Sequence, residues 1–375
     1  MEETYLTTKC KPSCYGCKGC ELACPKKCIN MKSDEEGFWY PEIRQEECIN
    51  CDLCEKVCPI NGRYMKEDFL EEAEIYATYN RDEEKRIISS SGGMFIIYAE
   101  HILDQGGVVF GVSFDSSFKV MHKEALTMEG VHEFLGSKYT QSDVGEVYKD
   151  VKKYLGEGKK VLFSGTPCQV AALYNYLGKD HENLFTIDLV CHGVFSPKVF
   201  NSYLDYVNKK SDNYDIKDIK FRSKLFGWGN YCMHIEYKDG QKYIEKKLED
   251  PFYLLYAYIA LRPSCYECTY SKSKREADVS IADYWRVRNH KPHLYDLKGL
   301  SLLFNNSKKA QKVFEQTSEK MMYERCTLEE VMQRNLEAPT PKSEMRDEFF
   351  ESYNKEGFEK TVEKMWDRLI DQFNK

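Results

Sequence analysis

The sequence predicts a protein of mixed α+β and α/β class: a small cysteine-rich domain at residues 1–65, a larger α/β body at 75–310 and a helical C-terminal extension at 311–375. Three observations lead to this prediction. Eight of the 16 cysteines form a repeated motif near the N-terminus. Two central segments each read as a strand, a small-residue turn and a helix, which is the pattern of a parallel sheet covered by helices. The last segment is charged and has helical periodicity.

The repeated motif is C-x2-C-x2-C-x3-C-P, which occurs as CYGCKGCELACP and again as CINCDLCEKVCP. This is the ligand spacing of a bacterial-type ferredoxin with two 4Fe-4S clusters, in which three close cysteines bind one cluster and the fourth binds the other. The predicted ligands are Cys14, Cys17, Cys20 and Cys58 for the first cluster, and Cys48, Cys51, Cys54 and Cys24 for the second. A pair of zinc knuckles is the alternative, although structural zinc uses a longer gap between its ligand pairs.

Composition limits the partners that the chain is expected to have. Lys and Arg number 54 against 61 Asp and Glu, a net charge of -7, which argues against a nucleic-acid partner. The start, MEETYLTTKCK, has no apolar signal core, and the longest apolar run, FYLLYAYIAL, is too short to span a membrane. The cysteine spacings are those of metal sites rather than of a secreted disulfide framework. We therefore expect a cytoplasmic protein.

After the motif, the charged segment NGRYMKEDFLEEAE is expected to link the two domains. The next segment, SSSGGMFIIYAEHILDQGG, predicts a helix that begins near a Ser/Gly turn and ends at a glycine pair. Free backbone N–H groups at such a turn suit a phosphate, although the serine hydroxyls can equally well cap the helix. The candidate ligand-binding residues in this turn are Ser90, Ser91, Gly92 and Gly93.

A hairpin is predicted from VVFGVSF and KVMHKEAL, and the segment LGSKYTQSDVG follows it. This segment combines polar side chains with an aromatic ring, a composition that suits a flavin ring or a phosphate. A solvated loop is the other interpretation. The candidate residues here are Lys138, Tyr139, Gln141 and Ser142.

Four further cysteines are candidates for a third cluster. The two strand-turn-helix units place Cys168 and Cys191 at the carboxyl ends of their strands, where open α/β sheets bind ligands. After an antiparallel segment, a late C-x2-C pair adds Cys265 and Cys268. Four thiolates are enough for one 4Fe-4S cluster. A structural zinc ion and a redox-active disulfide in the late pair remain alternatives.

Other titratable residues have less specific signals. His192 directly follows Cys191 and is a candidate proton donor, but a histidine that only packs in the core or supports a ligand fits equally well. Cys10 and Cys28 flank the first cysteine run. Cys232 and Cys326 are expected to be packing residues.

Several segments, in order, resemble the coenzyme F420 hydrogenase/dehydrogenase beta-subunit family over residues 75–310. They are SSSGGMF, GSKYTQS, LFSGTPCQVAAL, DLVCHGV, FRSK, RPSCYECTYSK and ADVSIADYW. The resemblance implies an iron-sulfur flavoprotein whose body binds FAD, with FMN less expected. It also implies that Cys168, Cys191, Cys265 and Cys268 hold the body cluster, and that the flavin contacts are the Ser/Gly turn, the polar residues of 138–142 and Thr166. The family usually has a GDFWG-like segment where this chain has ADYWR, so Ala282 and Arg286 replace glycines, which makes coenzyme F420 a less certain substrate.

The function that follows is electron transfer between a one-electron carrier and an organic two-electron substrate, through three 4Fe-4S clusters and FAD. A flavin is needed because it can exchange either one or two electrons. The expected partners are a ferredoxin or a hydrogenase/dehydrogenase subunit and a small organic substrate, and a homo-oligomer is compatible with the sequence. The alternative is an electron-transfer subunit of a larger F420-reducing hydrogenase or formate dehydrogenase type of complex.

Overall fold

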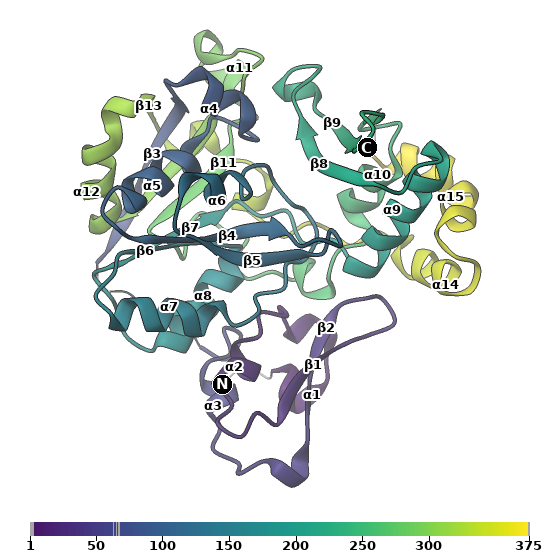
Figure 1. Cartoon of the computed structure of the whole chain (residues 1–375), viewed down its shortest axis with the longest axis horizontal. Helices are drawn as coiled ribbons and strands as arrows, with labels where there is room; N and C mark the ends of the chain where they lie inside the picture. The colour runs from purple at the N-terminus through teal and green to yellow at the C-terminus, as the bar shows by residue number, and fades with distance from the viewer. Residues whose placement is uncertain (1–3, 63, 65, 67, 374–375) are drawn as a thin grey trace.

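The computed structural model describes residues 4–62, 64, 66 and 68–373, and its architecture is the predicted mixed α/β one (Figure 1). The N-terminal part lies at one side of the body. Its elements are α1 (Tyr5–Thr8), α2 (Gly19–Ala23), β1 (Ile29–Ser33), β2 (Trp39–Ile43) and α3 (Leu53–Lys56). β1 and β2 form an antiparallel hairpin in which Ile29 lies opposite Ile43.

The sequence repeat is also a structural repeat. α2 and α3 pack against each other, and each contains the third cysteine of its motif. Each helix follows a residue in the left-handed conformation, Lys18 at φ 62° and Asp52 at φ 56°. The same spacing of cysteines therefore produces the same local turn twice.

The largest sheet among the described residues has eight strands in the order β13-β3-β12-β11-β7-β6-β4-β5. The strands are β3 (Phe69–Asn80), β4 (Val108–Phe114), β5 (Val120–Ala125), β6 (Val161–Ser164), β7 (Leu184–Leu189), β11 (Val279–Asp283), β12 (Ser301–Ser307) and β13 (Met321–Cys326). β4, β6, β7 and β11 are parallel, whereas β5, β12, β3 and β13 add antiparallel edges. The predicted β4–β5 hairpin and the two parallel strand-turn-helix units are confirmed.

Helices cover both faces of this sheet. α7 (Val147–Gly156) and α8 (Pro167–Leu177) share a core with Val108 and Phe110 of β4. α5 (Met94–Leu103) and α12 (Lys308–Thr317) pack with Val109, which points to the opposite face because side chains alternate along a strand. α2 of the N-terminal part packs against α7 and α8.

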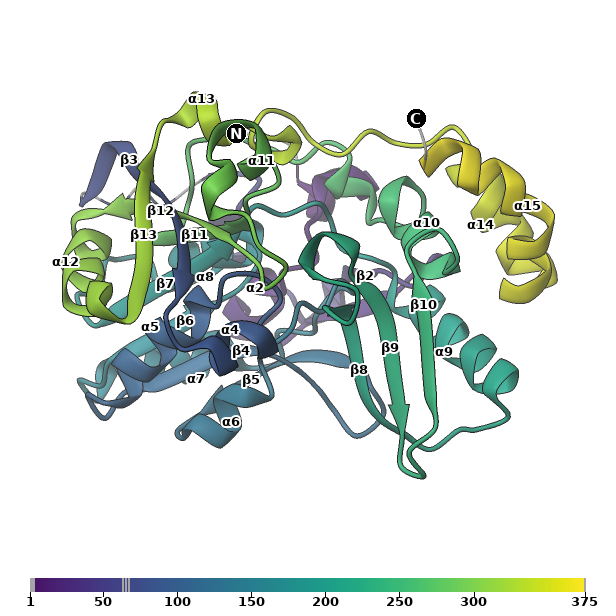
Figure 2. The ribbon, with the colours of Figure 1, turned by 90° about the horizontal axis from the view of Figure 1, so that it is seen from above.

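A second, smaller unit stands beside the large sheet (Figure 2). It is the predicted antiparallel portion, which is confirmed as a sheet of β8 (Ile216–Ser223), β9 (Cys232–Tyr237) and β10 (Lys242–Lys246). Four helices share its core: α9 (Pro197–Ser211), α10 (Pro251–Tyr258), α14 (Arg346–Glu356) and α15 (Phe358–Phe373). Phe38 and Tyr40, at the N-terminal hairpin, enter the same core and so attach the cysteine-rich part to the body.

The remaining α-helices of the described chain are short: α4 (Glu83–Ile88), α6 (Met128–His132), α11 (Val287–His290) and α13 (Leu328–Val331). Among the helices that the structure describes, none is both long enough and apolar enough to cross a membrane.

Two expectations about chain segments were wrong in part. The expected linker after Pro59 includes the start of β3, where Phe69 pairs with Ser307; residues 63, 65 and 67 of that linker lie outside the described residues. The C-terminal segment, expected to be helical, contains β13, in which buried Met321 and Cys326 flank polar positions. Both strands gain hydrogen bonds from distant partners, which local periodicity does not reveal. The domain boundaries themselves stay a prediction.

Candidate functional site

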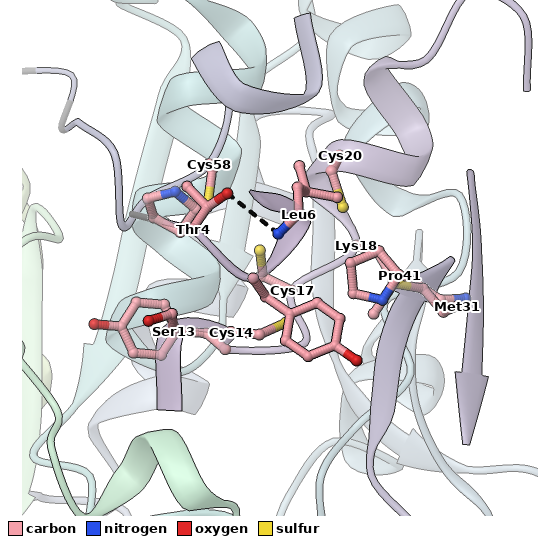
Figure 3. A pocket seen from close by; sticks show the side chains of 13 residues that line it. Thr4, Leu6, Ser13, Cys14, Cys17, Lys18, Cys20, Met31, Pro41 and Cys58 are labelled. Carbon is pink, nitrogen blue, oxygen red and sulfur yellow. Dashed lines mark hydrogen bonds between the residues drawn. The ribbon is translucent and has the colours of Figure 1, made fainter. Parts of the chain in front are cut away.

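The first four predicted ligands line a single pocket in the N-terminal part (Figure 3). Cys14, Cys17, Cys20 and Cys58 come from two separate turns, together with apolar residues such as Leu6. Burial raises the pKa of Cys17 to about 12 and the pKa of Cys58 to about 11. Free thiols here would stay protonated at neutral pH, whereas metal coordination deprotonates a thiol. Four cysteines around an apolar pocket fit a 4Fe-4S cluster, and we call them the first site.

The second predicted set lines another pocket. Cys24, Cys48, Cys51 and Cys54 gather there, and we call them the second site. Cys28 is a fifth thiol in this pocket, and its Sγ lies 3.4 Å from Sγ of Cys24. Cys28 is buried directly before β1, so its proximity depends on the hairpin and not on the motif spacing.

All 16 cysteines are free thiols, and the zinc and disulfide alternatives for the body cysteines stay predictions. Within the described ranges, no three His, Cys, Asp or Glu side chains are placed so that they could hold a single metal ion. Cys10 is exposed and lies in neither pocket.

The four body cysteines, Cys168, Cys191, Cys265 and Cys268, come together from three turns. Cys168 lies in the first turn of α8, which begins at Pro167 because Thr166 and Gln169 form a capping box. Burial raises the pKa of Cys191 to about 12, and the negative charge of Cys268 adds to the rise. Burial, followed by the charges of Cys268, Cys191 and Cys265, likewise raises the pKa of Cys168. Such mutual effects require the four sulfur atoms to be close to one another.

The first site adjoins the body cysteines. Tyr15 follows Cys14 in the chain, packs on Tyr270 with ring centroids 5.4 Å apart, and shares a cluster with Cys168 and Cys268. Its hydroxyl lies 3.1 Å from Oγ1 of Thr269. One layer of side chains therefore separates the two groups of thiols.

The Ser/Gly turn leads into α5, but its serine hydroxyls do not cap that helix. The N-cap residue is Gly93 at φ 83°, without a side-chain cap. Ser91 Oγ instead donates to Leu300 O. A Cβ on Gly92 would lie 2.5 Å from Thr78 O and 2.8 Å from Ser301 N, so this glycine lets the turn pack on β3 and β12. The capping interpretation is wrong, and close packing on the sheet explains why Gly92 has no side chain.

The 138–142 segment starts beside the Ser/Gly turn. Ser137 N donates to Ser90 Oγ over 2.7 Å, which joins the two segments. Lys138 Nζ donates to Glu133 O and Leu135 O, and burial lowers the pKa of Lys138 to about 7.

The same segment ends near the body cysteines. The Tyr139 ring stacks on Tyr256 with centroids 4.7 Å apart. Ser142 Oγ accepts from Gln169 Nε2, and Thr166 Oγ1 lies 3.2 Å from Cys168 Sγ. Gln141 is buried and turns toward the N-terminal part, where its Nε2 donates to Tyr15 O. The nine candidate flavin residues thus lie along one path from the Ser/Gly turn to the body cysteines.

Arg222 of the FRSK segment was not singled out by sequence reasoning, although the segment itself was noted. Its side chain is buried, and Nη1 pairs with Asp283. The other two nitrogens, Nε and Nη2, have no hydrogen-bond partner among the residues that the structure covers. The rings of Tyr231 and Trp285 lie 4.4 Å and 5.1 Å from its guanidinium carbon.

Lys224 of the same segment fixes the Ser/Gly turn. Its Nζ donates to Ser91 O, Arg86 O and Lys298 O. Burial, with added repulsion from Arg222 and Arg86, lowers the pKa of Lys224 to about 7. The turn is therefore held by three hydrogen bonds from one lysine.

Two residues that the sequence analysis singled out, His192 and Arg286, already have hydrogen-bond partners within the chain. His192 has Nε2 2.8 Å from Ala257 O and Nδ1 3.3 Å from Thr340 Oγ1, and burial lowers the pKa of the ring. Its role as a proton donor stays a prediction. Arg286 donates to Met332 O and Glu329 O at the end of α13, so its guanidinium is hydrogen-bonded to backbone carbonyls. Ala282 lies in β11.

These thiol sites on a mixed α/β scaffold define an iron-sulfur protein of the oxidoreductase type. Residues 13–61 match the family model of the 4Fe-4S dicluster domain. Residues 158–331 match the C-terminal domain of the coenzyme F420 hydrogenase/dehydrogenase beta subunit. The chain is thus similar to this beta-subunit family over residues 158–331 and has a 4Fe-4S dicluster domain at its N-terminus.

Individual relatives cover parts of the chain. It is 20% identical over 217 residues to an F(420)H(2) dehydrogenase subunit of Methanosarcina mazei, covering 55% of this chain and 60% of that protein. It is 35% identical over 65 residues to a ferredoxin of Mycolicibacterium smegmatis, or 17% of this chain and 57% of that one. Ferredoxin 7Fe of Hydrogenibacillus schlegelii is 36% identical over 71 residues, or 18% of this chain and 85% of that one. The chain thus spans less than two thirds of the first two relatives.

A solved structure, the F420-reducing [NiFe] hydrogenase complex from Methanosarcina barkeri, has a chain that aligns with a TM-score of 0.47 at 17% identity. The alignment covers 80% of this chain and 95% of that one.

Proposed function

We propose that the protein is an iron-sulfur flavoprotein oxidoreductase that passes electrons between a one-electron carrier and a small organic two-electron substrate. Its redox groups would be three 4Fe-4S clusters and FAD, with FMN the less favoured flavin. The observation that carries this proposal is the grouping of twelve cysteines into three sets of four, two of which adjoin at Tyr15. Iron-sulfur clusters exchange single electrons, and a flavin exchanges one or two.

The thiols of the first site and of the body cysteines are suited to a metal that is bound permanently. Burial raises the pKa values of Cys17 and Cys191, so these thiols without a metal would be protonated and would lack the charge that a soft metal ligand provides. Assembly then releases protons and couples cluster binding to folding. The role of these side chains is to surround each cluster with sulfur and to keep water away from it.

Arg222 supports a flavin near the 138–142 segment. A buried guanidinium with two unused donor nitrogens suits the negative charge of a flavin or of its phosphates. Tyr139, Tyr231 and Trp285 provide aromatic surfaces around it. Because Gly92 is already explained by packing on the sheet, the Ser/Gly turn is weaker support than Arg222.

Iron and flavin content test the proposal directly. Protein purified without oxygen should contain about twelve irons per chain, as three four-iron clusters require, and should release FAD on denaturation. Cys168→Ser should remove about four irons. Cys232→Ser is the matched control, because Cys232 is buried in the small sheet and should leave the iron content unchanged. Eight irons in the intact protein would remove the third cluster, and a colourless zinc protein would overturn the proposal.

A second candidate is an electron-transfer subunit of a larger complex, in which a partner protein supplies the substrate site and the substrate could be coenzyme F420. The similarity to a protein named as a dehydrogenase subunit favours this candidate. Steady turnover of a small acceptor by the isolated chain with reduced viologen would argue against it. A redox partner protein, such as a ferredoxin or a hydrogenase subunit, belongs to both candidates.

A further inference from the structure

Arg262 is fully buried where the N-terminal part meets the body. Its Nε donates to Cys14 O over 2.7 Å, its Nη2 to Trp39 O over 2.9 Å, and its Nη1 to Gln141 Oε1 over 3.1 Å. It lies three residues before Cys265. One side chain therefore joins the first site, the N-terminal hairpin, the 138–142 segment and the turn that carries two body cysteines.

The acceptors of Arg262 are all neutral. No carboxylate in the described parts of the chain forms an ion pair with it, whereas the other buried arginines near the sites have one: Arg275 with Asp188, Arg222 with Asp283 and Arg346 with Glu36. A buried cation without a nearby anion is costly. The rings of Tyr40 and Phe38, 4.4 Å and 5.6 Å away, compensate only in part.

The thiolates of two sites are the anions that can balance this charge. Arg262 Nε donates to the carbonyl oxygen of Cys14, a predicted ligand of the first site, and the chain reaches Cys265, a body cysteine, three residues after Arg262. The first site also rests directly on this side chain. A Cβ on Gly16 would lie 2.8 Å from Nη1 of Arg262 and 2.3 Å from Nε2 of Gln141.

We infer that Arg262 is a positioning residue that fixes the first site against the body cysteines and whose charge favours the reduced state of the clusters at both. The inference rests on the proposed function, because it requires a cluster at each place. Reduction adds negative charge to a cluster, and a fixed cation nearby stabilises the more negative state. The second site is an internal reference, because its pocket contains no residue that contacts Arg262.

Redox titration of the full-length protein, followed by electron paramagnetic resonance together with an iron assay, tests this role. Arg262→Gln removes the charge but keeps an amide donor. At a fixed potential it should lower the reduced-to-oxidised ratio of two clusters at least tenfold, a shift of 59 mV for one electron. The cluster of the second site should not shift. Arg262→Lys keeps the charge and should shift the same two clusters less than Arg262→Gln does.

Two further variants separate charge from structure. Arg86→Gln removes a buried arginine that pairs with Asp296, away from the thiol sites, and should leave every cluster potential unchanged. Gln141→Glu keeps Arg262 but places a carboxylate against its Nη1, so it should lower the same two potentials. This variant decides the question if Arg262→Gln loses iron.

The outcomes distinguish the inference from the proposed function. Equal shifts in Arg262→Gln and Arg262→Lys would overturn the role of the charge. Unshifted potentials in iron-replete Arg262→Gln, or in Gln141→Glu, would do the same. Wild-type protein with only eight irons would instead overturn the proposed third cluster, whatever the potentials of the other two.

Discussion

Gly16 offers a sharp test of how the first site is attached to the body. It lies between Cys14 and Cys17 at φ 66°, and an added Cβ would lie 2.3 Å from Gln141 Nε2 and 2.8 Å from Arg262 Nη1. For a residue with a side chain, the left-handed backbone costs roughly 1–2 kcal/mol. Displacing a buried hydrogen bond to a charged group costs about 1.5–3 kcal/mol more. Gly16→Ala should therefore destabilise this loop by about 2.5–5 kcal/mol.

The matched control is Gly19→Ala, two residues beyond Cys17. A Cβ there would meet no atom closer than 3.7 Å, and its backbone is not left-handed. The assay is the rate at which a chelator bleaches the cluster absorbance under argon, because cluster loss requires local opening of the loop. Every 1.4 kcal/mol is a factor of ten, so Gly16→Ala should lose iron at least about fiftyfold faster than Gly19→Ala. Equal rates would refute the close contact between this loop and Arg262.

Three other variants test neighbouring statements. Cys28→Ser should keep the full iron content, because Cys24 is the predicted ligand; loss of about four irons would identify Cys28 as the ligand. Arg222→Gln should lower the flavin retained after gel filtration at least tenfold without changing the iron content, and unchanged flavin would contradict its proposed role. Burial raises the pKa of Asp250 to about 7, above the value of about 4 in unfolded chains. Its stabilising contribution is thus present below pH 4 and is lost as the pH rises through 7. Relative to wild type, Asp250→Asn should gain thermal stability between pH 4 and pH 7, and a constant difference in midpoint over that range would contradict this.

The cysteine sites were accessible from sequence because their information is local. The two C-x2-C-x2-C-x3-C-P runs determine the turns before α2 and α3 and so predict which thiols share a pocket. The position of Cys168 was also predictable from local sequence. The apolar run of β6 indicates the strand, and the capping residue Thr166 indicates that α8 starts just before Cys168.

Arg262 was not accessible from sequence, because its partners lie at positions 14, 39 and 141 and no local pattern connects them. Gly92 illustrates a different limit. A glycine beside a helix start indicates that something approaches the backbone closely, but it cannot tell whether that is a ligand or a strand. In this fold the atoms that approach belong to β3 and β12.

The three thiol sites differ in how far their cysteines are exposed to solvent. Cys51 of the second site is exposed, and the neighbouring loop also exposes Ile49 and Leu53. Burial is instead the main cause of the raised pKa values of Cys17 in the first site and of Cys191 in the body. A one-electron carrier of protein size can approach the second site at Cys51, whereas none of the four body cysteines is exposed. The first site adjoins the body cysteines at Tyr15, so under the proposed function the N-terminal domain would conduct electrons to a flavin near Arg222 in the body.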